Sequence, residues 1–302
     1  MSLFNFAVAK TIMHVPKPIV SYFAKGYIAG STLDDAVQVS KDLNSQGMMT
    51  TIDILGEFIT RFDQAVEFKN QALEILRTID REKLNGNLSI KPTQMGLLLD
   101  QERCLELIRE LVTEAKKLDS FVRVDMEDIG TTDATLEMFD KLRTEYPGHV
   151  GTVLQSYLHR TPQDVINLDN GYQNYRLCKG IYVEPRLHAW KNPQAINRNF
   201  IHSLELMFKQ GAYAAIATHD ELLVYEAMHL VRKMGLPPDK YEFQMLLGVD
   251  EELREIILKE GHRLRIYVPY GVDWLPYSRR RLKENPSIAQ HALKQMLGIN
   301  KH

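Results

Sequence analysis

The sequence has few of the features that assign a chain to a specialised class of protein. Only two cysteines, Cys104 and Cys178, occur among its 302 residues, and they are far apart without the spacing of a metal site. The formal net charge is only -2, which argues against a general nucleic-acid-binding protein, because such proteins carry a broad basic excess. The start has no basic region and no cleavage site of a secretory signal, so we expect a reducing, cytoplasmic location.

Long apolar runs are also missing. The N-terminal segment "MSLFNFAVAKTIMHVPKPIV" is interrupted by Lys10, His14 and Pro16 and is too short to span a bilayer. We expect an amphipathic helix there, and peripheral contact with the inner face of a membrane stays an open alternative. Nothing in the sequence indicates an oligomeric state.

Several common catalytic motifs are absent. No Gly-x-Gly-x-x-Gly follows a predicted strand, which argues against a Rossmann-type pyrophosphate site, and no Gly-x-Ser-x-Gly elbow occurs. His219 has no second histidine at the spacing of a metal centre, so we expect no metal site. The segments "LLGVD" and "PYGVD" hold only one glycine each, which is weak support for the phosphate-binding loops that barrel enzymes often have there.

The sequence does contain a regular alternation of short strand-like runs and amphipathic helical stretches. Hydrophobic residues make up 44% of the chain, which is enough for a sizeable core. The predicted strands are Met48–Ile54, Leu88–Lys91, Phe121–Asp125, Gly151–Gln155, Tyr175–Lys179, Ala212–Thr218, Tyr241–Met245 and Leu264–Val268. Eight strand–helix units of about 30 residues predict an α/β fold, a (β/α)8 TIM-like barrel.

We expect two parts in the chain. Residues 1–46 are predicted to form an N-terminal helical arm, and residues 47–302 the (β/α)8 barrel catalytic domain. The segment "STLDDAVQVSKDLNSQG" reads as a capped helix from Ser31 or Thr32 to Gly47. This helix would either plug the bottom of the barrel or pack on its side.

Charged residues interrupt the apolar strands near their carboxyl ends, where barrel enzymes build their catalytic face. Lys91, Asp125 and Arg176 are the clearest examples. Because burying an unpaired charge costs several kcal/mol, we expect these side chains to pair with each other or with a ligand. Other polar residues near strand ends are Glu57, Gln155, Lys179, Thr218, His219, Glu242, Gln244, Tyr267 and Tyr270.

Three consecutive arginines follow the last predicted strand, in "YSRRRLKEN". In a helix, Arg280 and Arg281 share the face of Tyr277, whereas Arg279 points elsewhere. Two guanidinium groups match a carboxylate, and the tyrosine ring offers an apolar wall. The pattern indicates a small ligand with a carboxylate and an apolar body, although a solvated helix face is the simpler alternative for a charge run.

These segments resemble the proline dehydrogenase family, flavoenzymes that oxidise L-proline to Δ1-pyrroline-5-carboxylate. The resemblance rests on "LGE", "LSIKPTQMG", "VRVDMED", "VLQSYLHRT", "YRLCKGIYVEP", "AIATHD", "YEFQMLLG", "LRIYVPYG" and "YSRRRLKEN", in family order from about residue 47 to 285. The single-activity bacterial form fits best, because no aldehyde-dehydrogenase domain is attached. The resemblance implies FAD as the cofactor, a membrane quinone as electron acceptor, and the first step of proline degradation to glutamate.

The resemblance also implies a role for individual residues. In the substrate site, Lys91, Arg280 and Arg281 would bind the carboxylate, Tyr277 and Leu246 would wall the ring, and Glu57 would pair with Arg280. Asp125, which would interact with Lys91, and Arg176, near flavin N5, are the implied catalytic residues. The implied FAD contacts are Met126 through its backbone, Gln155, Arg176, Lys179, Gly180, Ile181, Thr218 and His219. Ile181 and Val183 depart from the Ala and Trp that the family often has, and we expect both to change the packing of the flavin pocket.

We call Arg280 and Arg281, with Lys91, the carboxylate clamp. Together this clamp and the implied flavin predict hydride transfer from C5 of proline to flavin N5, with the amine nitrogen neutral. The clamp would fix one end of a small rigid ring so that C5 can lie about 3–3.5 Å from N5. Solvent could accept the amine proton. Two other functions remain: a Schiff-base lyase or aldolase barrel that uses Lys91 or Lys179, and a non-enzymatic carboxylate-binding barrel.

Overall fold

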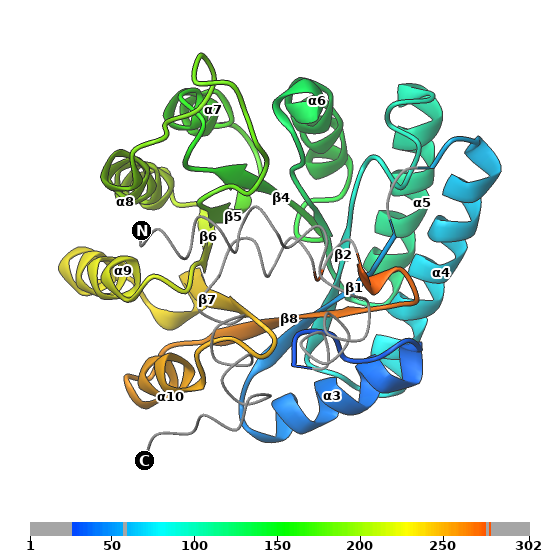
Figure 1. Ribbon diagram of the computed structural model, residues 1–302, viewed down its shortest axis with the longest axis horizontal. Helices are drawn as coiled ribbons and strands as arrows, with labels where there is room; N and C mark the ends of the chain where they lie inside the picture. Colours follow the sequence, from blue (N-terminus) through cyan, green and yellow to red (C-terminus); the bar gives the residue numbers. More distant parts are fainter. Residues whose placement is uncertain (1–25, 57–58, 276–277, 279–302) are drawn as a thin grey trace, which may run out of the picture.

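The computed structural model describes residues 26–56, 59–275 and 278. In this part of the chain eight parallel strands form a closed barrel, in which each strand pairs with the next and the last pairs with the first (Figure 1). The strands are β1 (Met49–Ile54), β2 (Gly86–Ile90), β3 (Val122–Val124), β4 (Val150–Gln155), β5 (Asn174–Cys178), β6 (Tyr213–Ala217), β7 (Tyr241–Leu246) and β8 (Leu264–Tyr270). The predicted barrel is confirmed, and each predicted strand overlaps an observed one.

Helices surround the barrel (Figure 1). They are α3 (Leu33–Ser45), α4 (Phe62–Arg81), α5 (Gln101–Lys117), α6 (Ile129–Glu145), α7 (Thr161–Asn167), α8 (Pro193–Lys209), α9 (Glu221–Met234) and α10 (Glu251–Lys259), with a 3-10 turn at Pro238–Lys240. Several begin at a side-chain cap: Asp100, Asp128 and Asn192 each accept a bond from the backbone N–H three residues later. Each cap satisfies a backbone N–H in the first turn of its helix, which fixes where the preceding loop ends.

Helix α3 precedes the barrel. Thr32 and Asp35 form a reciprocal capping box at its start, so the predicted N-terminus is confirmed. The helix lies beside β1 and β8 on the outside of the barrel, which is the second of its two predicted positions (Figure 1). Residues 1–25 lie outside the described part of the chain, and the division at residue 46 stays a prediction.

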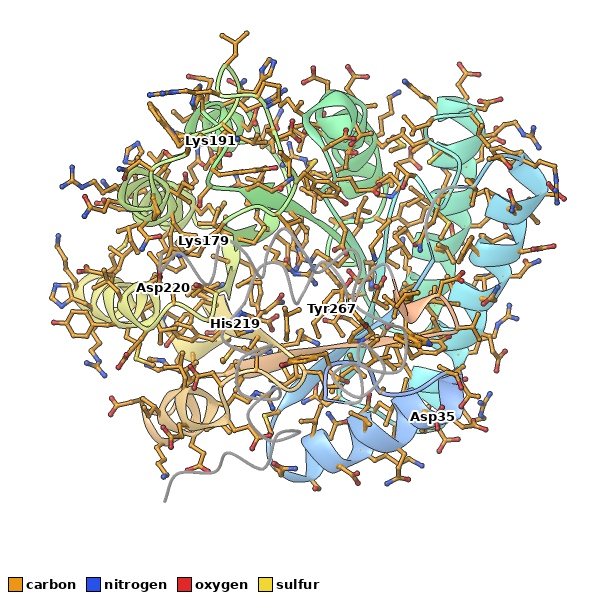
Figure 2. The ribbon with its side chains drawn as sticks, viewed as in Figure 1. Asp35, Lys179, Lys191, His219, Asp220 and Tyr267 are labelled. Atoms are coloured by element: carbon orange, nitrogen blue, oxygen red, sulfur yellow. The ribbon has the colours of Figure 1, made fainter. Side chains whose placement is uncertain are left out.

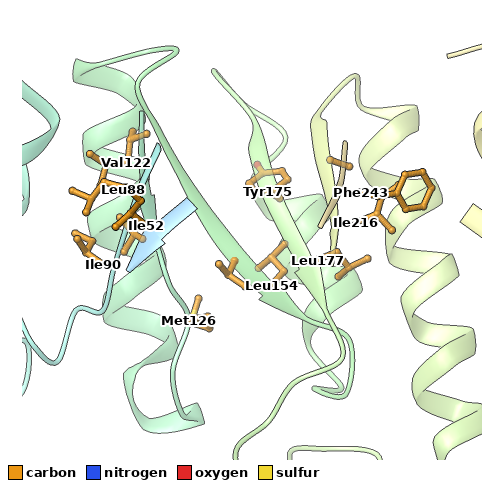
Figure 3. Packing of buried hydrophobic residues seen from close by; sticks show 14 of the residues in the cluster. Ile52, Leu88, Ile90, Val122, Met126, Leu154, Tyr175, Leu177, Ile216 and Phe243 are labelled. Atoms are coloured by element: carbon orange, nitrogen blue, oxygen red, sulfur yellow. The ribbon is translucent and has the colours of Figure 1, made fainter. Parts of the chain in front are cut away.

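The hydrophobic core lies between the strands and the surrounding helices. Side chains alternate along a strand, and Ile52, Leu88 and Val122 take the outward positions (Figure 3). The inward positions are largely polar, as the 2.6 Å bond between the hydroxyl of Thr51 and the side-chain oxygen of Asn87 shows. Because buried polar groups need partners, this interior is a connected hydrogen-bonding network rather than an apolar plug.

Glu242 is the centre of one part of this network. Its carboxylate accepts bonds from Arg265 Nε at 2.7 Å and from the Tyr213 hydroxyl at 2.7 Å. Burial alone would raise the pKa of Glu242, but the charge and hydrogen bonds of Arg265 outweigh it and lower the pKa to about 2. The folded state therefore prefers the ionised carboxylate.

We expect Glu242 to contribute to acid stability. Its ordinary pKa is 4.5, so its contribution is complete above that pH and is lost as the pH falls toward about 2. The shift corresponds to about 3 kcal/mol of unfolding free energy. Glu242→Gln should remove most of this pH dependence and, because Arg265 then lacks its anion, should cost about 3–5 kcal/mol at neutral pH.

The measurement is urea unfolding of both proteins across this pH range. Glu145→Gln is the matched control, because Glu145 forms a more exposed ion pair with Arg109. If Glu242→Gln kept the acid dependence of the wild type, the assignment to this carboxylate would be wrong.

Candidate functional site

A cavity of about 560 Å³ opens at the carboxyl ends of the strands. Figure 2 shows Lys179, His219, Asp220 and Tyr267 around this central opening. Each described residue to which the resemblance gives a role lines the cavity: Lys91, Asp125, Met126, Gln155, Arg176, Lys179, Gly180, Ile181, Thr218, His219 and Leu246. The other members of the predicted site lie outside the described residues: Glu57, Tyr277, Arg280 and Arg281, together with Arg279.

Lys91 directly follows β2 and reaches back toward β1. Its ammonium nitrogen lies 2.8 Å from each carboxylate oxygen of Asp53, which is only 1% exposed. Burial would lower the pKa of Lys91, but the charges of Asp53 and Asp125 outweigh that effect and raise the pKa. Lys91 is therefore held as a cation at the cavity wall.

Asp125 has a different set of partners from the expected one. Its carboxylate accepts bonds from Arg176 at 2.6 Å, Ser89 at 2.7 Å and the Tyr267 hydroxyl at 3.0 Å. It interacts with Lys91 through its charge, whereas the hydrogen bonds of Lys91 go to Asp53. The sequence analysis missed Asp53, although this carboxylate interrupts an apolar strand just as Lys91, Asp125 and Arg176 do.

Arg176 and Gln155 line the cavity, and each has a buried polar atom without a partner among the described residues. Arg176 donates from Nε to Gln244 and from Nη1 to Asp125, each at 2.6 Å, while its buried Nη2 has no partner among the described residues. Gln155 donates to the carbonyl oxygen of Glu127, and its buried Oε1 also lacks a partner in the described chain. An unsatisfied buried polar group costs about 1–3 kcal/mol, so a donor and an acceptor here suit a bound polar ligand.

One wall of the cavity is formed by residues at the carboxyl ends of β5, β6 and β7. Lys179 pairs with Asp220 at 2.6 Å, and His219 Nε2 accepts a 2.8 Å bond from the backbone N–H of Leu246. Gly180 has φ +105°, and a Cβ at this position would lie 2.2 Å from the ring of Tyr157. Only glycine fits there, because the backbone is left-handed and a side chain would collide with Tyr157.

The two expected departures from the family pattern have different surroundings. Ile181 lines the cavity and is 37% exposed, so it can affect the packing of a ligand. Val183 is 86% exposed and does not line the cavity. The expected effect of Val183 on the packing of the pocket therefore has no support in this cavity and stays a prediction.

Two further searches cover the described residues only. No helix in this part of the chain is long and apolar enough to cross a membrane. Within the same ranges, no group of three or more His, Cys, Asp or Glu side chains is arranged to hold a metal ion.

Comparisons with known proteins identify the family. The model of the proline dehydrogenase family matches residues 36–293. The chain is 35% identical over 274 residues to proline dehydrogenase 1 of Bacillus subtilis, covering 91% of this chain and 90% of the relative. It is 34% identical over 278 residues to proline dehydrogenase of Deinococcus radiodurans, with the same two coverages.

A solved structure shows the same architecture. Proline utilization A from Bdellovibrio bacteriovorus, inactivated by N-propargylglycine, matches with a TM-score of 0.82 and 25% identity. The match covers 88% of this chain but only 33% of that longer chain. The near-complete coverage of the Bacillus and Deinococcus relatives agrees with the single-activity bacterial form. This chain belongs to the proline dehydrogenase family.

Proposed function

We propose that this chain is an FAD-dependent enzyme that oxidises L-proline to Δ1-pyrroline-5-carboxylate and passes the electrons to a quinone, the first step of proline degradation to glutamate. The observation that carries the proposal is the arrangement of one cavity. A cationic Lys91 lines it together with Arg176 and Gln155, each of which has a buried polar atom without a partner among the described residues. The family relationship supports the identity of both ligands.

The residues present fit a flavin. Arg176 Nη2 offers a donor and Gln155 Oε1 an acceptor, and a flavin ring system carries both kinds of group on its edge. The residues that would hold FAD are Met126, Gln155, Arg176, Lys179, Gly180, Ile181, Thr218 and His219. When bound, FAD supplies the two-electron acceptor for the hydride of proline C5, and a quinone then takes the electrons.

Lys91 would receive the substrate carboxylate. An ammonium group has three N–H donors, and two of those of Lys91 point to Asp53. The third can bond to a carboxylate in the cavity, and the raised pKa keeps the charge that such a bond needs. Arg280 and Arg281 would bind the same carboxylate, Tyr277 and Leu246 would wall the ring, and Glu57 would pair with Arg280.

The reaction removes a hydride and a proton from proline. The C5–H bond breaks with its electron pair, the amine N–H proton leaves, and a C5=N double bond forms. Water can take the amine proton, because the cavity opens to solvent. The role of the protein is to hold the ring by its carboxylate, so that C5 takes one position relative to Arg176.

The surroundings of the two lysines argue against a Schiff-base lyase or aldolase. A Schiff-base lysine needs a neutral amine, which burial beside another cation or in an apolar pocket can supply. Lys91 instead has a raised pKa and bonds to both oxygens of Asp53, and Lys179 forms a 2.6 Å pair with Asp220.

The test is the visible spectrum of the purified protein, before and after incubation with FAD. We expect flavin absorption that bleaches when L-proline is added without oxygen and returns when a water-soluble quinone is added. Pyrrolidine, which lacks the carboxylate, should bleach the flavin far more slowly. A colourless protein that cannot take up FAD would contradict the proposal and favour a carboxylate-binding barrel.

A further inference from the structure

A single buried carboxylate determines the position of Lys91. Asp53 lies on β1, in register with Ser89 of β2, and Lys91 follows two residues after Ser89. Asp53 does not line the cavity, whereas Lys91 does. We propose that Asp53 is the positioning residue of the substrate site, which holds the Lys91 ammonium so that its remaining N–H faces the carboxylate of the substrate; this inference rests on the proposed function.

Lysine needs such a partner to act as a precise donor. Its four-carbon stem is flexible, and fixing it costs side-chain entropy. The two 2.8 Å bonds to Asp53 fix the nitrogen before any substrate arrives. Substrate binding then does not have to order this side chain, which preserves affinity.

The other charged groups near Lys91 are already engaged. Asp125, directly after β3, pairs with Arg176 on β5 at 2.6 Å and accepts a bond from Tyr267 on β8. Glu127, after β3, accepts bonds from the backbone N–H and the hydroxyl of Thr93. Asp53 is therefore the only carboxylate that the described residues place in hydrogen-bond contact with Lys91.

The opposite role would be competition, in which Asp53 occupies Lys91 and the substrate must displace it. The two roles predict opposite results for Asp53→Asn. Positioning predicts that KM for proline rises about tenfold or more, a change of about 1.4 kcal/mol, while kcat changes by less than about threefold. A lower KM would show competition and overturn the proposal.

Two ligands separate this effect from a general loss of structure. The inhibition constant of cyclopentanecarboxylate, which has the ring and carboxylate but no amine to oxidise, should rise by the same factor as KM. Pyrrolidine, which lacks the carboxylate, should inhibit the wild type and Asp53→Asn equally. If pyrrolidine binding weakened as much as that of cyclopentanecarboxylate, the role of Asp53 would be structural and the proposal would fail.

The pH profile gives a second readout. Without the Asp53 charge, burial should dominate and lower the pKa of Lys91, although Asp125 and Glu127 still oppose this effect. The alkaline limb of kcat/KM should therefore move about one pH unit or more toward lower pH in Asp53→Asn. Asp53→Glu keeps the charge but displaces it, so KM should rise while the alkaline limb of kcat/KM stays in place. If the alkaline limb of Asp53→Asn also stayed in place, the proposal would be contradicted.

Asp164→Asn is the matched control. Asp164 is a buried carboxylate on α7 that pairs with Arg160 and does not line the cavity. The Asp164→Asn variant should have a lower free energy of unfolding but an unchanged KM and an unchanged alkaline limb of kcat/KM. If Asp53→Asn does not fold, Asp53→Glu carries the test through its KM. A wild type that does not oxidise proline would refute the proposed function, whereas an active wild type with unaffected Asp53 variants would refute this inference alone.

Discussion

Replacing Arg176 by methionine should lower kcat for proline by about 10²- to 10³-fold, the typical loss when one preorganised charged donor is removed from a reacting centre. Arg176 lines the cavity and is fixed by Gln244 and Asp125, and its buried Nη2 has no partner in the described chain. A cation there would favour the build-up of negative charge on the bound cofactor. The measurement is kcat at saturating proline, normalised to the flavin content of each preparation.

The control uses another buried arginine of the barrel. Arg123 on β3 donates to the carbonyl oxygens of Thr152 and Asn174 and does not line the cavity. Arg123→Met should reduce the unfolding free energy but leave kcat within a few-fold of the wild type, because its contacts are structural. Arg176→Lys should recover part of the lost rate. Equal rates for Arg176→Met and the wild type would remove Arg176 from the catalytic residues.

The second large effect is expected for Lys91→Met. Truncating one member of a buried charged pair costs about 2–5 kcal/mol of binding, so KM for proline should rise about 30-fold or more. The single change also leaves Asp53 buried without a cation, which should lower the unfolding free energy. Steady-state kinetics and urea unfolding measure the two effects separately.

The double variant Lys91→Met with Asp53→Asn separates binding from folding. It removes both charges, so it should recover stability relative to Lys91→Met while KM stays high. Without Lys91 the change at Asp53 should have no further effect on KM, which gives a non-additive double-mutant cycle. An additive cycle would mean that Asp53 and Lys91 act on proline independently.

The barrel itself could be predicted from local patterns. The apolar runs around Ile52 and Leu88, followed by capped amphipathic helices, are short-range signals that survive folding because each is satisfied within one strand–helix unit. The candidate site was predictable for a related reason. Parallel strands bring their carboxyl ends to one mouth, so the charges of Lys91, Asp125 and Arg176 had to meet there.

The choice of partners could not be predicted in the same way. Lys91 pairs with Asp53 because β1 and β2 are hydrogen-bonded neighbours, whereas Arg176 on β5 reaches Asp125, directly after β3, across the barrel interior. Which side chains of different strands come within reach of one another depends on strand tilt and stagger, which no local pattern specifies. The exposure of Val183 has a similar cause, since the path of the loop after β5 depends on packing around it.

By itself, the sequence determined the order of strands and helices and the set of charges at the barrel mouth, because periodicity and residue chemistry act over a few residues. Only the tertiary structure decided that Asp53 holds Lys91, that Asp125 holds Arg176, and that Arg176 and Gln155 each keep a buried atom without a partner in the described chain. Hydrogen bonds act over about 3 Å, so closure of the barrel, rather than spacing along the chain, selects which of many compatible groups come into contact.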